Sequence, residues 1–258
     1  PALRALALPP DPMPAFLRGR PLKAWRYVAF FAPPLIACLA QVRIGPLRDS
    51  FWAVWDREGG LFWRGRRTVA LDDAEACIAS AHVRLQLTFA PAPGVETVCP
   101  SGGLYGWTVK QAPLPATATL QTGNAPLHYE GQVLLDDTAA YYPRHTSWYW
   151  SAGVGRSLAG QSLAWNLVSG VNDPPRDSER TVWVDGVASE APPCHFAADL
   201  RAVDALRFAP EATLARHTNL GWLRSDYRQP MGTFTGTLAG GIELAHGLGV
   251  MERHDAWW

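Results

Sequence analysis

The sequence has little charge and no excess of either sign. Charged residues make up 18% of the 258 positions, and 23 basic side chains balance 23 acidic ones. A neutral chain exerts no long-range attraction on nucleic acid or on anionic membranes, so we expect neither as a partner. Disorder is also excluded, because hydrophobic residues reach 48% and disordered chains combine low hydrophobicity with high net charge.

Cysteine is scarce and its spacing is uninformative. Cys38, Cys77, Cys99 and Cys194 include no C-x-x-C pair, so we expect free thiols and no structural metal site. The longest apolar stretch, Val28–Leu39, is interrupted by two prolines and is shorter than the roughly 20 residues of a membrane-spanning helix. The first residues lack the charged and then apolar order of a signal peptide. We therefore expect a cytoplasmic protein without a transmembrane segment.

Familiar catalytic and cofactor motifs are also missing. The sequence has no G-x-S-x-G, no P-loop and no H-E-x-x-H, and Gly153-Val154-Gly155 lacks the third glycine of a dinucleotide fingerprint. We expect no cofactor and no metal.

Short apolar runs separated by turn signals dominate the chain. With 23 Gly and 22 Pro, long helices are disfavoured, and only Asp72–Ser80 looks helical. Asp185-Gly186 and Glu58-Gly59-Gly60 predict hairpin turns. This pattern predicts an all-β, antiparallel fold, either a lipocalin-like β-barrel or a two-part β-sandwich. We expect an N-terminal arm over residues 1–20 and two barrel-like halves over 21–124 and 125–258.

Aromatic residues are abundant, with twelve Trp, nine Phe and seven Tyr. Each buries about 150–250 Å², yet Trp packs well only where its N–H finds a partner. Two interpretations follow: some indoles line a cavity, or they form an ordinary core with some exposed on the surface.

Two segments combine aromatic and polar side chains. In Arg144–Gly153, strand alternation places Trp148 and Trp150 on one face and His145 on the other. In Asn219–Pro230, Arg224 and Asp226 share a face and could pair, and Tyr227 is a candidate acid or hydrogen-bond donor. Structural roles as core strands or as a structural ion pair are the alternatives.

A third segment, Gly249–Trp258, has the strongest signal for chemistry. Glu252 and His254 lie two residues apart, so on a strand they share a face with Val250 and Ala256. A buried carboxylate next to an imidazole suits proton transfer, because burial raises the pKa of Glu. The alternative is an incidental pair at the end of a surface strand.

Five segments carry a family resemblance. They are GRPLKAWRY (Gly19–Tyr27), SFWAVWDR (Ser50–Arg57), HTSWYWSAGVG (His145–Gly155), LGWLRSDYRQPMGTFTG (Leu220–Gly236) and GVMERHDAW (Gly249–Trp257). They resemble the domain of unknown function 2804 family. More distantly, the chain is similar to the lipocalin-like group that includes carotenoid hydratases, tocopherol cyclases and polyketide or terpenoid cyclases. That resemblance implies two β-barrel-like halves, an apolar cavity and no redox cofactor.

These observations predict an enzyme that hydrates, isomerises or cyclises an apolar terpenoid, polyketide or lipid-like substrate by proton transfer. The predicted catalytic residues are Glu252, His254, Asp226 and Tyr227. The predicted substrate-binding residues are His145, Trp148, Trp150, Asn166, Arg224, Gln229 and Trp55. Two alternatives stay open: a carrier for a hydrophobic small molecule without catalysis, and a glycan-binding or glycan-processing protein. The substrate, the direction of reaction and the oligomeric state are left open.

Overall fold

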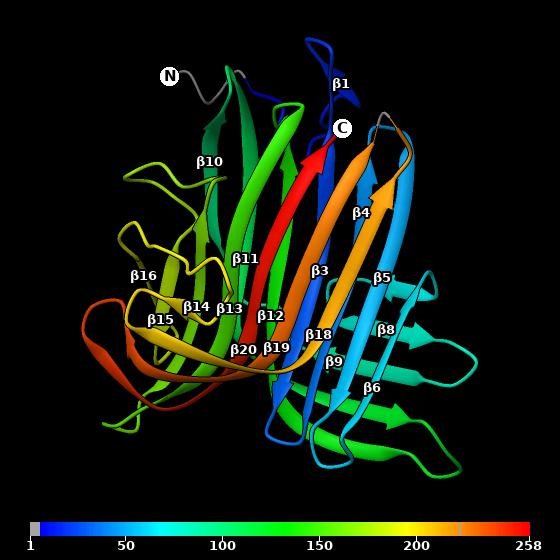
Figure 1. The fold of residues 1–258 in the computed structure, drawn as a ribbon, viewed down its shortest axis with the longest axis vertical. Helices are drawn as coiled ribbons and strands as arrows, with labels where there is room; N and C mark the ends of the chain where they lie inside the picture. The colour runs from blue at the N-terminus through cyan, green and yellow to red at the C-terminus, as the bar shows by residue number, and fades with distance from the viewer. Residues whose placement is uncertain (1–5, 222) are drawn as a thin grey trace.

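The computed structural model describes residues 6–221 and 223–258, and every regular element in this part of the chain is a β-strand. Two large antiparallel sheets of long strands lie one in front of the other (Figure 1). Neither sheet closes on itself within the described ranges. The predicted all-β, antiparallel fold is therefore confirmed, and it takes the form of a two-part sandwich.

The first large sheet has ten strands, nine of them in the order β6-β5-β4-β3-β12-β11-β9-β8-β7, and β10 pairs with β11 outside this path. Its strands in chain order are β3 (Lys23–Ala32), β4 (Leu35–Ile44), β5 (Leu47–Asp56), β6 (Leu61–Arg66), β7 (Val69–Leu71), β8 (Glu75–Ala79), β9 (Arg84–Phe89), β10 (Val95–Ser101), β11 (Leu104–Gln121) and β12 (Leu127–Ala140).

The second large sheet has eight strands in the order β16-β15-β14-β13-β20-β19-β18-β17. These are β13 (His145–Ser157), β14 (Ser162–Ser169), β15 (Thr181–Val184), β16 (Val187–Glu190), β17 (Ala202–Val203), β18 (Leu206–Asn219), β19 (Arg224–Leu238) and β20 (Ile242–Trp257). A small hairpin of β1 (Phe16–Leu17) and β2 (Arg20–Pro21) precedes both sheets.

The continuous apolar run Val28–Leu39 forms two strands that are buried on both faces. Pro33 and Pro34 occupy the turn between β3 and β4, whose register pairs Ala32 with Leu35. Proline lacks the N–H that a ladder needs, so it ends one strand and starts the next. Burial on both faces explains why this segment shows no polar alternation.

Local turn signals are informative in most places. Asp185 and Gly186 have φ of 50° and 81°, as a type I′ hairpin requires, and they join β15 to β16 as predicted. The predicted helix at Asp72–Ser80 is wrong, because Glu75–Ala79 is strand β8. The Asp72 carboxylate accepts backbone N–H groups of Ala74 and Glu75 at 2.9 and 2.6 Å. Such a bond also caps helices. Here, however, the residues that follow have an alternating burial pattern and form strand β8.

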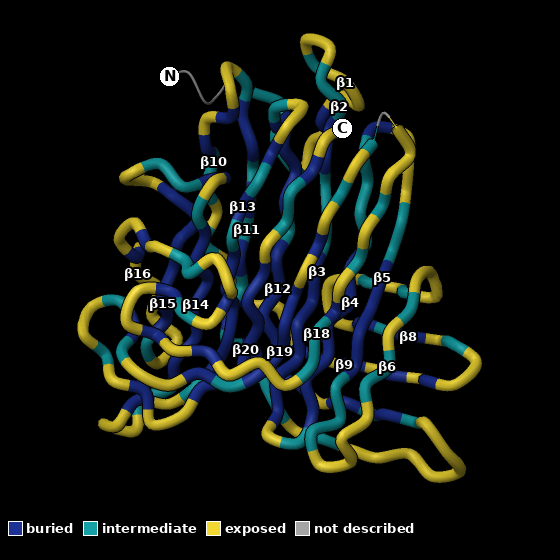
Figure 2. The backbone as a smooth tube through the Cα atoms, viewed as in Figure 1, coloured by how far each residue is buried: buried dark blue, intermediate teal, exposed yellow. Residues whose placement is uncertain are grey.

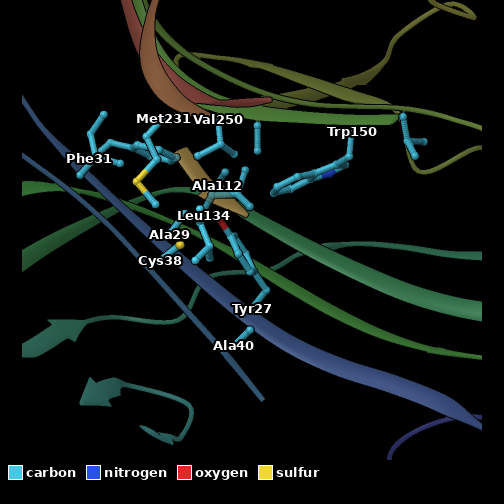
Figure 3. Packing of buried hydrophobic residues seen from close by; sticks show 14 of the residues in the cluster. Tyr27, Ala29, Phe31, Cys38, Ala40, Ala112, Leu134, Trp150, Met231 and Val250 are labelled. Atoms are coloured by element: carbon cyan, nitrogen blue, oxygen red, sulfur yellow. The ribbon is translucent and has the colours of Figure 1, made fainter. Parts of the chain in front are cut away.

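The interior is divided into layers. Buried residues concentrate along the middles of the long strands, and exposure rises at the loops (Figure 2). One apolar cluster lies between the two large sheets. Figure 3 shows this contact, with Tyr27 on one side and Trp150 and Val250 on the other. Two further clusters lie on the other faces of the sheets.

The chain passes from the first sheet to the second after Ala140. Strand β12 completes the first sheet by pairing with β3 and β11, so residues 127–140 belong to that sheet although the predicted second half begins at 125. The change of sheet lies after residue 140, and the predicted halves over 21–124 and 125–258 stay a prediction. Residues 6–221 and 223–258 contain no helix with the length and apolar character needed to cross a bilayer.

Candidate functional site

A cavity of about 340 Å³ lies between the two large sheets. Apolar and aromatic side chains from both sheets line most of it, and a few ionisable groups face the same space. Its lining includes Lys23, Trp25, Tyr27, Phe51, Asp136, Trp148, Trp150, Val168, Val171, Glu179, Ser225, Tyr227, Glu252, His254 and Trp258. This composition is typical of small-molecule sites, which combine an apolar wall with few polar groups.

Glu252 on β20 is a buried carboxyl group in this lining, with a relative exposure of 7%. Its Oε1 accepts the indole N–H of Trp148 at 2.8 Å, and its Oε2 accepts the side-chain N–H of Gln229 at 2.9 Å. Desolvation raises the pKa of Glu252 to about 7, although hydrogen bonds from Trp148 and Gln229 oppose the shift. Near neutral pH the group can therefore both give and take a proton.

Tyrosine hydroxyl groups surround this carboxyl. Tyr27 on β3 donates to Gln229 Oε1 at 3.3 Å, which extends the chain of hydrogen bonds from one sheet to the other. The buried hydroxyl of Tyr227 makes no hydrogen bond of good geometry within the described ranges. Burial raises the pKa of Tyr227 well above its usual 10.0. Tyr227 thus stays protonated and keeps an unused donor at the cavity.

His254 lines the cavity two residues beyond Glu252. Its ring packs on Trp148 with centroids 4.3 Å apart, and its Nε2 lies 2.7 Å from Ser225 Oγ. Desolvation lowers the pKa of His254 to about 3. The imidazole is therefore neutral at physiological pH and acts as a hydrogen-bonding partner beside the carboxyl.

Two stacked indoles connect Glu252 to a second acidic region. Trp25 and Trp148 stack with centroids 5.9 Å apart and planes at 12°. Trp148 donates to Glu252, whereas Trp25 donates its N–H to Asp136 Oδ2 at 3.2 Å. The indole N–H groups thus satisfy two buried carboxyl groups, and they fix both carboxyls relative to one aromatic wall.

Asp136 belongs to a buried cluster with one lysine and two carboxyl groups. Lys110 Nζ is in contact with Asp136 Oδ1 and lies 3.3 Å from Glu179 Oε2. Asn172 donates to Glu179 Oε2 at 3.0 Å. Desolvation, only partly offset by Lys110, raises the pKa of Glu179. Desolvation would lower the pKa of Lys110, but the two carboxylates outweigh it and raise the value.

Lys23 is the second buried lysine and lines the cavity. Its Nζ donates to the main-chain oxygens of Tyr142 at 3.2 Å and Pro143 at 3.0 Å, and it lies 4.1 Å from the ring centroid of Trp258. In the described part of the chain, no carboxylate lies within ion-pair distance of this ammonium group. Desolvation, aided by Arg20, lowers the pKa of Lys23 to about 7.

The structure places five predicted residues around the cavity: Glu252, His254, Tyr227, Trp148 and Trp150 all line it. Gln229 is fully buried directly behind Glu252. The shared face of Glu252 and His254, predicted from strand alternation, is present on β20.

Three predicted site residues lie outside the cavity. Arg224 and Asp226 are exposed, because the inward positions of β19 are the odd ones that carry Tyr227 and Gln229. The predicted ion pair between Arg224 and Asp226 is absent from the described part of the chain. His145 is exposed, stacks on Trp257 at 4.3 Å and lies 3.0 Å from Asp255.

Two further predicted residues contact other side chains and do not line the cavity. Asn166 is fully buried and accepts the N–H of Trp150 at 2.7 Å, so it orients a cavity-lining ring. Trp55 on β5 donates to Glu211 Oε2 on β18 at 2.9 Å, and neither residue belongs to the cavity lining. Neither is placed to touch a molecule in the cavity directly.

Sequence reasoning missed several residues at the cavity or directly beside it, namely Lys23, Trp25, Tyr27, Lys110, Asp136 and Glu179. One signal could have indicated two of them. Lys23 and Lys110 are the only lysines in the chain, and all other strong bases are arginines. Among the described residues, no three His, Cys, Asp or Glu side chains are arranged to hold a metal ion.

Comparison with known proteins places this architecture among solved folds. The chain is similar to the crystal structure of a provisionally assigned AttH from Nitrosomonas europaea, with a TM-score of 0.54 and 14% identity over 96% of this chain and 98% of the other. It is also similar to kievitone hydratase from Nectria haematococca, with a TM-score of 0.50 and 12% identity over 90% and 88%. A search of curated proteins found no match. The model of one family, the domain of unknown function DUF2804, matches residues 63–258, and this chain belongs to that family.

Proposed function

We propose that this protein binds an apolar, unsaturated small molecule between its two sheets and transfers a proton to it from Glu252. The observation that carries the proposal is the position of this carboxyl group. It lines an apolar cavity, and burial raises its pKa to about 7. General acids work best when their pKa lies near the working pH.

The proton would move from Glu252 to a carbon of a double bond, which forms a C–H bond and leaves a cation on the neighbouring carbon. The indole walls of Trp25 and Trp148 can stabilise that charge through cation–π attraction. Water then adds to the cation and returns a proton to Glu252, so the net change is the addition of one water molecule. Loss of a different proton to the Glu252 carboxylate would instead isomerise the substrate. Attack by a second double bond on the cation, followed by the same loss of a proton from the new cation, would cyclise it.

Neighbouring groups support this role. The neutral imidazole of His254 can hold a water molecule or a substrate hydroxyl, because its low pKa keeps it uncharged. The unpaired hydroxyl of Tyr227 can donate a hydrogen bond to a substrate oxygen. A hydratase among proteins of the same fold, kievitone hydratase, is consistent with this chemistry, although the low identity extends the likeness only to the fold.

The carrier alternative needs the same cavity but no role for the carboxyl group. The glycan alternative predicts an exposed row of indoles, whereas Trp148 and Trp150 are buried. The geometry therefore favours an apolar ligand.

Isotope labelling tests the proposal and does not require the substrate to be identified first. An apolar metabolite extract is incubated with the protein in D2O, and mass spectrometry identifies compounds that gain deuterium or heavy water. We expect wild type to label at least one compound, and Glu252→Gln to reduce the rate by about 100-fold or more. Glu243→Gln, at an exposed position of the same strand, serves as the matched control.

Two results would contradict the proposal. Unchanged labelling by Glu252→Gln would remove this residue from the mechanism. An extract compound that binds tightly to wild type but never gains the isotope would identify the protein as a carrier.

A further inference from the structure

The cavity lining contains an acidic and a basic set of ionisable groups. Glu252, Asp136 and Glu179 are the acidic set, and indole, amide and lysine partners satisfy them. The basic set comprises Lys23, Arg48, Arg66 and Arg216. Of these, Lys23 and Arg48 lie at one end of the first sheet, which gives a bound molecule a preferred direction.

Lys23 lies at the basic end. The register of the first sheet pairs Lys23 with Ile44, and Ile44 with Leu47. Arg48 follows directly, so the two cationic residues belong to the same end of three adjacent strands. The C-terminus lies at this end of the molecule as well (Figure 1), which agrees with the contact between Lys23 and Trp258.

The arginines that line the cavity have few acidic partners. Arg66 and Arg216 both bind the same oxygen, Oδ2 of Asp49, each at 2.8 Å. Arg48 is exposed and forms no ion pair with any described residue. One carboxylate therefore binds two guanidinium groups, and Arg48 adds a third positive charge to the lining, so the surplus charge among these residues is positive.

Lys23 is the most deeply buried member of the basic set. Its relative exposure is 1%, and a buried ammonium group is costly unless an anion compensates for its lost hydration. Two of its three N–H groups are bound by main-chain oxygens. The third has neither a hydrogen-bond acceptor nor a carboxylate partner among the described residues, and the ammonium group lies over the ring of Trp258.

We propose that the ligand supplies this counter-charge: the molecule bound in this cavity is a carboxylic acid with an apolar body, and its carboxylate is held by Lys23, with Arg48 at the same end of the sheet. This inference rests on the proposed function, because it names the substrate class of the same site. It also orients the substrate. With the carboxylate at the basic end, the apolar body extends along the indole walls toward Glu252.

Three compounds with the same alkyl chain test the head-group preference: dodecanoate, dodecanol and dodecylamine, each titrated below its micelle concentration and followed by tryptophan fluorescence. We expect dodecanoate to bind about 10-fold more tightly than dodecanol, since charge-assisted hydrogen bonds are roughly twice as strong as neutral ones. Dodecylamine should bind most weakly. About 0.5 M salt should reduce the contribution of the exposed arginines more than that of buried Lys23.

Two variants assign the preference to residues. Lys23→Met should remove most of the advantage of dodecanoate and leave the affinity for dodecanol unchanged. Arg48→Gln, at an exposed position where folding is not at risk, should reduce the advantage about two- to threefold, as expected for an exposed charge pair. Arg84→Gln removes one positive charge from an exposed position of strand β9, outside the cavity lining, and should leave the preference for dodecanoate unchanged.

Equal binding of dodecanoate and dodecanol to wild type would overturn the inference, as would preferred binding of dodecylamine or the absence of binding by all three compounds. An unchanged preference in both Lys23→Met and Arg48→Gln would overturn it too. None of these results decides the role of Glu252, which the isotope experiment tests separately.

Discussion

Replacing Glu252 by Gln should change the way stability depends on pH, and this change can be measured without a substrate. The carboxyl group is buried at 7% exposure and lies between two hydrogen-bond donors. Gln has nearly the same shape but does not titrate. The difference in unfolding free energy between the two proteins therefore isolates the titration of one group.

The size of the effect follows from the pKa of Glu252, which is 4.5 without the fold and about 7 within it. At about 1.36 kcal/mol per pKa unit, the difference corresponds to roughly 3 kcal/mol. The sign is set by proton binding. Between these two pKa values the unfolded chain has lost the proton and the folded protein still holds it. Stability therefore falls as pH rises, and it levels off above the folded pKa.

Urea unfolding at intervals from pH 4 to pH 8.5 provides the measurement. Relative to Glu252→Gln, wild type should lose about 3 kcal/mol across this range, mostly between pH 4.5 and 7. His254 contributes an opposite trend at acid pH, but it is present in both proteins and cancels in the difference. Glu243→Gln on the same strand controls for the loss of one charge. A flat difference curve, or one that rises with pH, would refute the assignment of Glu252 as a carboxyl group held protonated by burial.

Three other substitutions test the packing and electrostatics of the interior by urea unfolding. Gly153→Ala should cost about 2 kcal/mol or more, because a Cβ atom there would lie 2.3 Å from the ring of Trp165. Lys110→Met should cost roughly 3–5 kcal/mol at neutral pH, since it leaves two buried carboxyl groups without their cation, and part of the loss should be recovered as the pH is lowered, because burial raises the pKa of Glu179 and favours its protonated form. Between pH 6.5 and pH 5, His254→Gln should remove roughly 2 kcal/mol of the acid sensitivity of wild type, because the folded protein resists protonation of this imidazole.

Each of these predictions has a clear contradicting result. Gly123→Ala is the control for the glycine, because a Cβ atom there meets nothing within 4 Å, and equal stability of the two variants would refute the packing argument. A Lys110→Met protein as stable as wild type at pH 7 would show that Asp136 and Glu179 do not need Lys110 as their counter-charge. A His254→Gln protein with the same acid sensitivity as wild type would assign that sensitivity to another group.

The sequence alone could predict which side chains share one face of a strand. Strand alternation has a period of two whatever the rest of the fold does, so the shared face of Glu252 and His254 and the shared face of Trp148 and Trp150 follow from local geometry. The Asp185-Gly186 turn follows in the same way, because it depends on φ angles that few residue types adopt. The apolar run interrupted by Pro33-Pro34 also contains its own turn.

Local rules fail where two structures share the same local signal. Asp72 binds backbone N–H groups as a helix cap would, and only the alternating burial of β8 in the first sheet distinguishes the strand from a helix. Alternation predicts that Arg224 and Asp226 share a face, and they do, but alternation alone does not say whether that face is turned toward the other sheet or toward solvent.

The tertiary structure alone decided which groups meet at the cavity. Lys23 and Glu252 are more than two hundred positions apart, and they face one space because two separate sheets pack together. The pKa of Glu252 depends on that enclosure, since desolvation by the opposite sheet is its largest cause. Sequence therefore determined the strands and the pairing of residues on each face. Packing of the two sheets determined which faces exclude water, and the exclusion of water is what gives their ionisable groups unusual proton affinities.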